Sequence, residues 1–133
     1  HRDFPREMMP NLRAQIVHLI ENRGVTQFYV GNQGYFDYAV LQILRSCRQI
    51  YPQISYSVVL AYMPQQELPG IEDTETLLPE QVELAPRRYA ICRRNRWMLE
   101  HADCVVTYIR HAYGGAARYA ALAARQGKEI LPL

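Results

Sequence analysis

The stretch SYSVVLAYM, residues 55–63, constrains the fold more than any other part of the chain. It is nearly continuous in apolar, β-branched and aromatic residues, whereas a strand with one face in water alternates apolar and polar residues. Strands covered on both faces are typical of parallel sheets between two layers of helices. The stretch therefore predicts a central parallel strand.

Helical and strand-like segments alternate around this strand. Apolar residues at helical spacing predict helices, and short β-branched or aromatic runs between them predict strands. Few positions in residues 64–86 are periodic, which predicts a long connection. The alternation predicts an α/β fold, a Rossmann-like three-layer sandwich with a mainly parallel sheet in which SVVLAY and CVVTYI are central. The predicted helices cover about residues 9–23, 36–47, 87–101 and 115–126, and the other predicted strands are TQFYV and EILPL.

Composition favours one globular domain over residues 1–133. Of the 133 residues, 49% are hydrophobic and 21% are charged, and no apolar run is long enough to cross a bilayer. The cysteines Cys47, Cys92 and Cys104 lack the spacing of a disulfide framework or a zinc site. These features predict a soluble, cytoplasmic protein without contact to a membrane. The net charge of +2 gives no reason to expect nucleic-acid binding.

Two glycine turns follow predicted strands, Gly31-Asn32-Gln33-Gly34 and Gly114-Gly115. In parallel α/β sheets, the carboxyl ends of strands face helix amino ends, where free N–H groups and the helix dipole favour an anion. Glycines also occur at such turns without any ligand, because glycine adopts positive φ angles and allows close packing. Phosphate or carboxylate binding and plain turn chemistry both remain open for these turns.

Arg94 lies in the middle of an apolar stripe on the predicted helix 87–101. The stripe contains Ala90, Ile91, Trp97 and Met98. A buried guanidinium requires an anionic partner, which is either a ligand or an acid of the chain such as Asp37 or Asp103. The nearby Arg88, Arg93 and Arg96 are expected to form a solvated face.

Asp37 is the candidate catalytic residue. In the first turn of a helix it can complement the helix dipole and cap free N–H groups. Beside a glycine turn it can also accept a hydrogen bond from a sugar hydroxyl, or act as base or nucleophile at an anomeric carbon. His1, His18, His101 and His111 lack metal-ligand spacing, so no metal and no other cofactor is expected.

The segments HRDF, VGNQGYFDYAV, VVLAYMP, RRNRWMLEHADCVVTYI and YGGAARYAALAARQGKEILPL together resemble the small bacterial members of the SLOG superfamily. This Rossmann-like superfamily includes the LOG phosphoribohydrolases and the DNA-processing protein A family. The resemblance implies a nucleotide or nucleotide-derived ligand near the glycine turns, and Arg94 matches the functional arginine of the LOG family. The ligand-binding residues expected on this basis are His1, Arg2, Gly31, Asn32, Gly34, Asp37, Arg94, Asn95, Gly114 and Gly115.

The chain also departs from the LOG pattern. LOG hydrolases carry Pro-Gly-Gly-x-Gly-Thr followed by a catalytic glutamate, and Ala120 stands at the place of that glutamate. Alanine can neither stabilise an oxocarbenium-like centre nor activate water, which argues against LOG-type hydrolysis. Relatives usually begin with a strand that ends in Gly-His-Arg, so we expect a first strand before His1.

Three functions remain open from the sequence. The first is binding or sensing of a nucleotide-like small molecule at the strand carboxyl ends. The second is an enzyme of nucleotide N-glycosidic bonds, a hydrolase or deoxyribosyltransferase, that uses Asp37. The third is an oligomeric domain with a vestigial pocket. The alanine-rich last helix and the 10 tyrosines predict a homodimer or higher oligomer, although the alanines can also serve close helix packing alone.

Overall fold

The computed structural model describes residues 4–64, 74–109 and 115–133. Helices and strands alternate along the chain, and all strand pairs within these residues are parallel. The strands form two sheets, with the orders β1-β2-β3 and β4-β5. The strands are β1 (Gln27–Val30), β2 (Ser55–Val59), β3 (Glu75–Leu77), β4 (Cys104–Thr107) and β5 (Glu129–Pro132).

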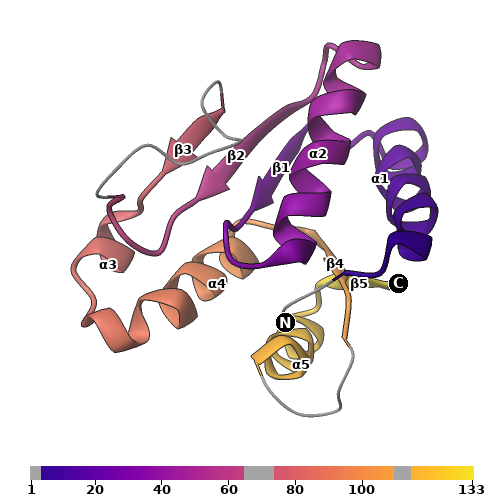
Figure 1. The fold of residues 1–133 in the computed structure, drawn as a ribbon. Helices are drawn as coiled ribbons and strands as arrows, with labels where there is room; N and C mark the ends of the chain where they lie inside the picture. Colours follow the sequence, from indigo (N-terminus) through magenta and orange to yellow (C-terminus); the bar gives the residue numbers. More distant parts are fainter. Residues whose placement is uncertain (1–3, 65–73, 110–114) are drawn as a thin grey trace.

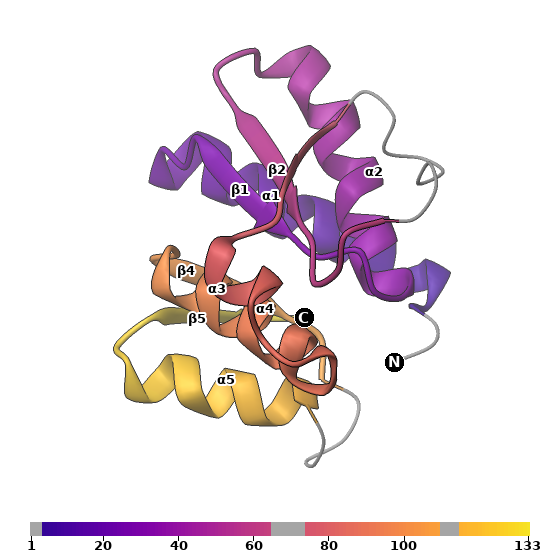
Figure 2. The same cartoon turned by 90° about the vertical axis from the view of Figure 1, so that its left-hand side faces the viewer.

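Helices cover both faces of the three-stranded sheet (Figures 1 and 2). Helices α1 and α2 pack side by side on one face, and α4 lies on the other. Helix α5 packs against β4 and β5. The helices are α1 (Met9–Arg23), α2 (Tyr35–Ile50), α3 (Glu80–Glu83), α4 (Ala90–Glu100) and α5 (Gly115–Arg125), with single 3-10 turns at Arg6–Met8 and Arg87–Tyr89.

The main core lies between the first sheet and its helices. The apolar stripe of α1 packs against α2, and Val58 and Val59 of β2 are completely buried. Gly24 ends α1 with a φ of 65°, a left-handed conformation that glycine adopts without the penalty of a Cβ atom. No helix in the described ranges is both long and apolar enough to span a bilayer.

The prediction of a mixed α/β fold with parallel strands is confirmed. Strand β2 is central in its sheet as expected. Among the described residues, β4 pairs with β5 on one edge, so the expected central position of CVVTYI stays a prediction. No strand among the described residues pairs with the other edge of β4 or with the free edge of β1. The connection predicted over residues 64–86 contains β3 and α3, which are too short to produce a periodic pattern.

Candidate functional site

The turn between β1 and α2 brings its backbone against two charged side chains. Gly31 is buried, and a Cβ atom there would lie 2.7 Å from Nη1 of Arg94 and 2.8 Å from Oδ2 of Asp37. Gly34 has a φ of 96°, in the left-handed region that favours glycine. Gly31 therefore serves close approach, and Gly34 serves the turn itself.

Arg94 is the most buried charged residue in the described part of the chain, with an exposed fraction of 3%. Its Nη1 donates to the backbone oxygen of Val59 at 3.2 Å, at the carboxyl end of β2. Its Nε donates to Oδ1 of Asn95 at 2.8 Å. These bonds hold the guanidinium beside Gly31, and no described residue accepts from Nη2.

Burial lowers the pKa of Arg94, and the negative charge of Asp37 opposes this shift. Within the described residues, the one ion pair with a nitrogen–oxygen distance below 4 Å joins Arg23 and Glu129. No described carboxylate oxygen therefore lies within 4 Å of the Arg94 guanidinium. Asp37 is therefore a neighbour of Arg94 and not a directly bonded partner. The other candidate partner, Asp103, is exposed.

Asp37 lies in the first turn of α2 and stabilises the glycine turn. Its Oδ2 accepts from the backbone N–H of Gln33 at 2.9 Å. Burial raises the pKa of the Asp37 carboxyl, while the Gln33 N–H and the charge of Arg94 act in the opposite direction. This bond holds the turn before α2, because Gln33 precedes the N-cap residue Gly34, and it engages one carboxyl oxygen among the described contacts.

The amino end of α2 adds further hydrogen-bond donors at the same place. The first N–H groups of a helix have no partner within the helix, and the dipole gives this end a partial positive charge. The amino end of α2 follows the turn that contains Gly31, and the Arg94 guanidinium and the Asp37 carboxyl both lie against Gly31. This arrangement can hold an anionic group and hydrogen-bond a neighbouring hydroxyl.

The structure brings together only part of the predicted site. Gly31, Asp37 and Arg94 form one cluster, which Asn95 supports through Arg94, and Asn32 and Gly34 belong to the adjoining turn. His1, Arg2 and Gly114 lie outside the described residues.

Gly115 does not join this cluster. Its Cβ position meets none of the described residues beyond its own helix within 4 Å, so it makes no close approach to Gly31, Asp37 or Arg94.

One detail of the predicted α4 stripe is wrong. Ala90 and Arg94 are buried as expected, but Ile91 is 38% exposed. The regular α-helix starts only at Ala90, after a 3-10 turn, and its buried face runs through Ala90, Arg94 and Leu99. Arg93 and Arg96 are exposed as predicted.

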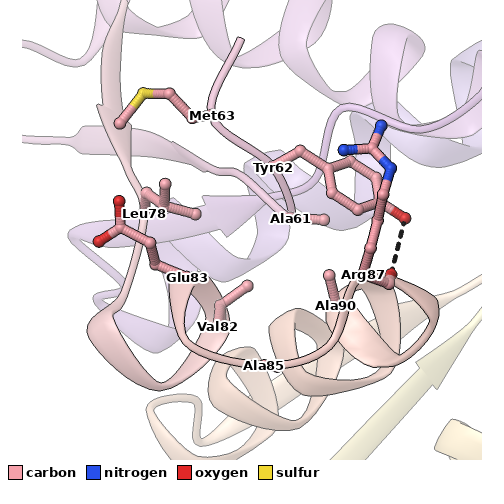
Figure 3. A pocket seen from close by; sticks show the side chains of 9 residues that line it. All are labelled: Ala61, Tyr62, Met63, Leu78, Val82, Glu83, Ala85, Arg87 and Ala90. Carbon is pink, nitrogen blue, oxygen red and sulfur yellow. Dashed lines mark hydrogen bonds between the residues drawn. The ribbon is translucent and has the colours of Figure 1, made fainter.

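A cavity of about 220 Å³ beyond the carboxyl end of β2 was not predicted from the sequence (Figure 3). Its lining comes from the residues after β2 and β3, from α3 and from the start of α4. The guanidinium of Arg87 lies over the Tyr62 ring, 4.3 Å from its centroid. The residues that line the cavity come from separate segments and form no sequence motif. They are Ala61, Tyr62, Met63, Leu78, Val82, Glu83, Ala85, Arg87 and Ala90.

Tyr119 of α5 also reaches the neighbourhood of Arg94 and was not expected there. Its hydroxyl donates to the backbone oxygen of Cys92 at 3.1 Å. Burial is the main reason that the pKa of Tyr119 is raised to about 12. The phenol therefore stays neutral at physiological pH.

No family model matches this chain, and none of the curated proteins matches it significantly.

Proposed function

We propose that this protein binds a nucleotide or nucleotide-derived ligand at the carboxyl ends of β1 and β2, without chemistry. The observation that carries the proposal is the buried guanidinium of Arg94, which has no carboxylate of the described residues within ion-pair distance. Burial of a charge is costly unless an opposite charge compensates it. An anionic ligand group beside Gly31 would supply that charge.

The proposed pose follows from the donors around Gly31. The phosphate of the ligand accepts from Arg94 and from N–H groups at the amino end of α2, while the sugar lies beside Asp37. The Asp37 oxygen that does not bind the Gln33 N–H accepts from a sugar hydroxyl. Gly31 permits Arg94 and Asp37 to lie close to the turn, because a side chain there would collide with both.

Calorimetric titration with a panel of nucleoside monophosphates tests this proposal. Arg94→Ala should weaken binding by about 2–5 kcal/mol, the cost of losing one partner of a desolvated charge pair. Arg93→Ala is the matched control, because Arg93 is exposed on the same helix. Thermal unfolding of both variants verifies that they are folded. Equal and small losses would show that Arg94 has only a structural role.

One observation favours the second candidate, an enzyme of nucleotide N-glycosidic bonds. Burial raises the pKa of Asp37, and a carboxyl with a raised pKa suits general acid or base catalysis. The enzyme would release free base from a nucleoside monophosphate, and Asp37→Asn would abolish the release. If the wild-type protein bound a nucleoside monophosphate and released no base, the enzyme proposal would be wrong and the binding proposal would remain.

We propose the SLOG superfamily as the family of this chain, on the strength of its glycine turn and the Arg-Asn-x-Trp-Met helix. We further propose that both sheets belong to one Rossmann-like three-layer sandwich. Parallel pairing within each sheet, and helices on both faces of the first sheet, support this arrangement. A parallel strand from outside the described residues would then pair with the open edges of β1 and β4.

We also propose that the protein forms a homodimer or higher oligomer in the cytoplasm. Several large apolar side chains of the described residues are exposed, among them Ile50, Met63 and Leu84. A partner copy that covers them would bury apolar surface that a monomer leaves in water. A sedimentation mass of 15.5 kDa at micromolar concentration would contradict the oligomer. An oligomer without nucleotide binding would instead favour the domain with a vestigial pocket.

A further inference from the structure

We propose that the cavity beside Tyr62 holds the aromatic base of the ligand, so that base and phosphate occupy two separate parts of one site. This inference rests on the proposed nucleotide binding and specifies how the ligand lies. The cavity has a volume of about 220 Å³, below the roughly 300–1,000 Å³ of pockets that enclose a whole small-molecule ligand. It therefore suits a single ring system, with the rest of the ligand outside.

The lining of the cavity suits a flat apolar ring. Ala61, Val82 and Ala90 are buried and form one apolar cluster, against which Tyr62 and Leu78 pack. Figure 3 shows the Arg87 guanidinium over the Tyr62 ring, with Leu78 and Val82 across the cavity from that ring. Aromatic rings favour offset-stacked or edge-to-face contacts, and the contact with Arg87 holds the Tyr62 ring in place for them.

The cavity and Arg94 are close to each other along two elements of the fold. Ala90 lines the cavity and Arg94 follows it on α4 by four residues, a rise of about 6 Å along the helix. Val59, whose oxygen accepts from Arg94, precedes Ala61 of the lining by two residues. The two parts of the site are thus joined twice, through α4 and through the end of β2.

Charge determines which end of the ligand enters the cavity. The lining contains one cation, Arg87, and one anion, Glu83, so it offers no net charge to a phosphate. Arg94, in contrast, is buried without a carboxylate of the described residues in ion-pair distance. The phosphate therefore binds at Arg94 and the uncharged base enters the cavity.

Splitting the ligand into its two halves tests the inference. Adenosine carries the base without phosphate, and ribose 5-phosphate carries the phosphate without base. Their affinities are measured by NMR titration against the wild-type protein and its variants. Ala85→Phe fills the cavity with a bulky side chain. Leu84→Phe is the matched control, because the neighbouring Leu84 side chain is 74% exposed and does not line the cavity.

Ala85→Phe should weaken adenosine binding at least tenfold and change ribose 5-phosphate binding less than twofold. Leu84→Phe should change neither, and Arg94→Ala should weaken ribose 5-phosphate far more than adenosine. Tyr62→Leu, which removes the ring without adding bulk, should also weaken adenosine, so the test does not depend on the folding of one variant.

Two failures are distinguishable. If the wild-type protein does not bind adenosine, or if Ala85→Phe and Tyr62→Leu leave adenosine affinity unchanged, the base does not occupy the cavity. If ribose 5-phosphate binds equally to the wild-type protein and to Arg94→Ala, the proposed phosphate site is wrong, whatever the cavity holds.

Discussion

The two parallel sheets use similar residues but differ in how well they are buried. In β2, Ser57, Val58 and Val59 are all buried, and helices cover both faces of the sheet around them. In β4, the corresponding apolar pair is Val105 and Val106, and no residue of the strand is buried. The same β-branched residues thus gain much more burial in β2.

The difference follows from the neighbours of each strand. Strand β2 pairs on both edges, whereas within residues 4–64, 74–109 and 115–133 strand β4 pairs only with β5. The second sheet reaches the first core through few contacts, among them Val106 and Leu133 against the main cluster and Tyr108 against Phe4. Burial in a sheet therefore depends on the completeness of the layers around a strand, and apolar sequence alone does not ensure it.

The largest expected effect compares the same substitution in both sheets. Val58→Ala should lower the free energy of unfolding by about 2–3 kcal/mol, because Val58 is completely buried and its loss leaves a cavity. Val105→Ala should cost less than about 1 kcal/mol, because Val105 remains partly exposed. Urea denaturation of both variants measures these values. Equal losses would mean that β4 is buried in solution, as a partner chain or a further strand would make it.

A smaller effect compares the two glycine turns. Gly31→Ala should destabilise the protein by about 1–3 kcal/mol, because its methyl group would displace the held guanidinium of Arg94. Gly115→Ala should instead stabilise it by about 0.5–1 kcal/mol, since Gly115 starts α5 with open space around its Cβ position. Thermal unfolding of the two variants gives the signs. A loss in Gly115→Ala would show that this turn also makes a close approach.

The sequence predicted what depends on local pattern and on single residues. The spacing of Leu12, Ile16 and Leu19 predicted a helix over about residues 9–23, where α1 lies, and the apolar stripe of α4 identified Arg94 as a buried charge. Asp37 was placed in the first turn of α2 as expected.

The sequence did not predict what depends on tertiary assembly. The pairing partners of β4 follow from the arrangement of whole layers, and Cys104 to Thr107 carry no signal for the number of their neighbours. The cavity beside Tyr62 combines residues from several elements, and the contact between Tyr62 and Arg87 has no sequence spacing of its own. Ile91 was misplaced because it lies at the edge of the α4 stripe, and the sequence does not show how far the neighbouring layers cover that edge.

The smallest expected effect concerns the link between the two regions through Tyr119. Its hydroxyl donates from α5 to the Cys92 oxygen of α4, and Tyr119→Phe removes this bond at a cost of about 1 kcal/mol. The pKa of Tyr119 is raised from 10.0 to about 12, so the folded protein keeps the proton over a range in which the unfolded chain loses it. The stabilisation is therefore complete below pH 10 and is lost as the pH rises toward 12.

Denaturant unfolding of the wild-type protein and of Tyr119→Phe between pH 8 and 12 measures both effects. The stability difference should be constant below pH 10 and shrink above it. Tyr35→Phe is the control, because the Tyr35 side chain is 61% exposed. If Tyr119→Phe matched Tyr35→Phe at every pH, the bond would not hold α5 to α4. The position of the β4–β5 sheet would then depend on its apolar contacts with the first core, such as those of Val106 and Leu133.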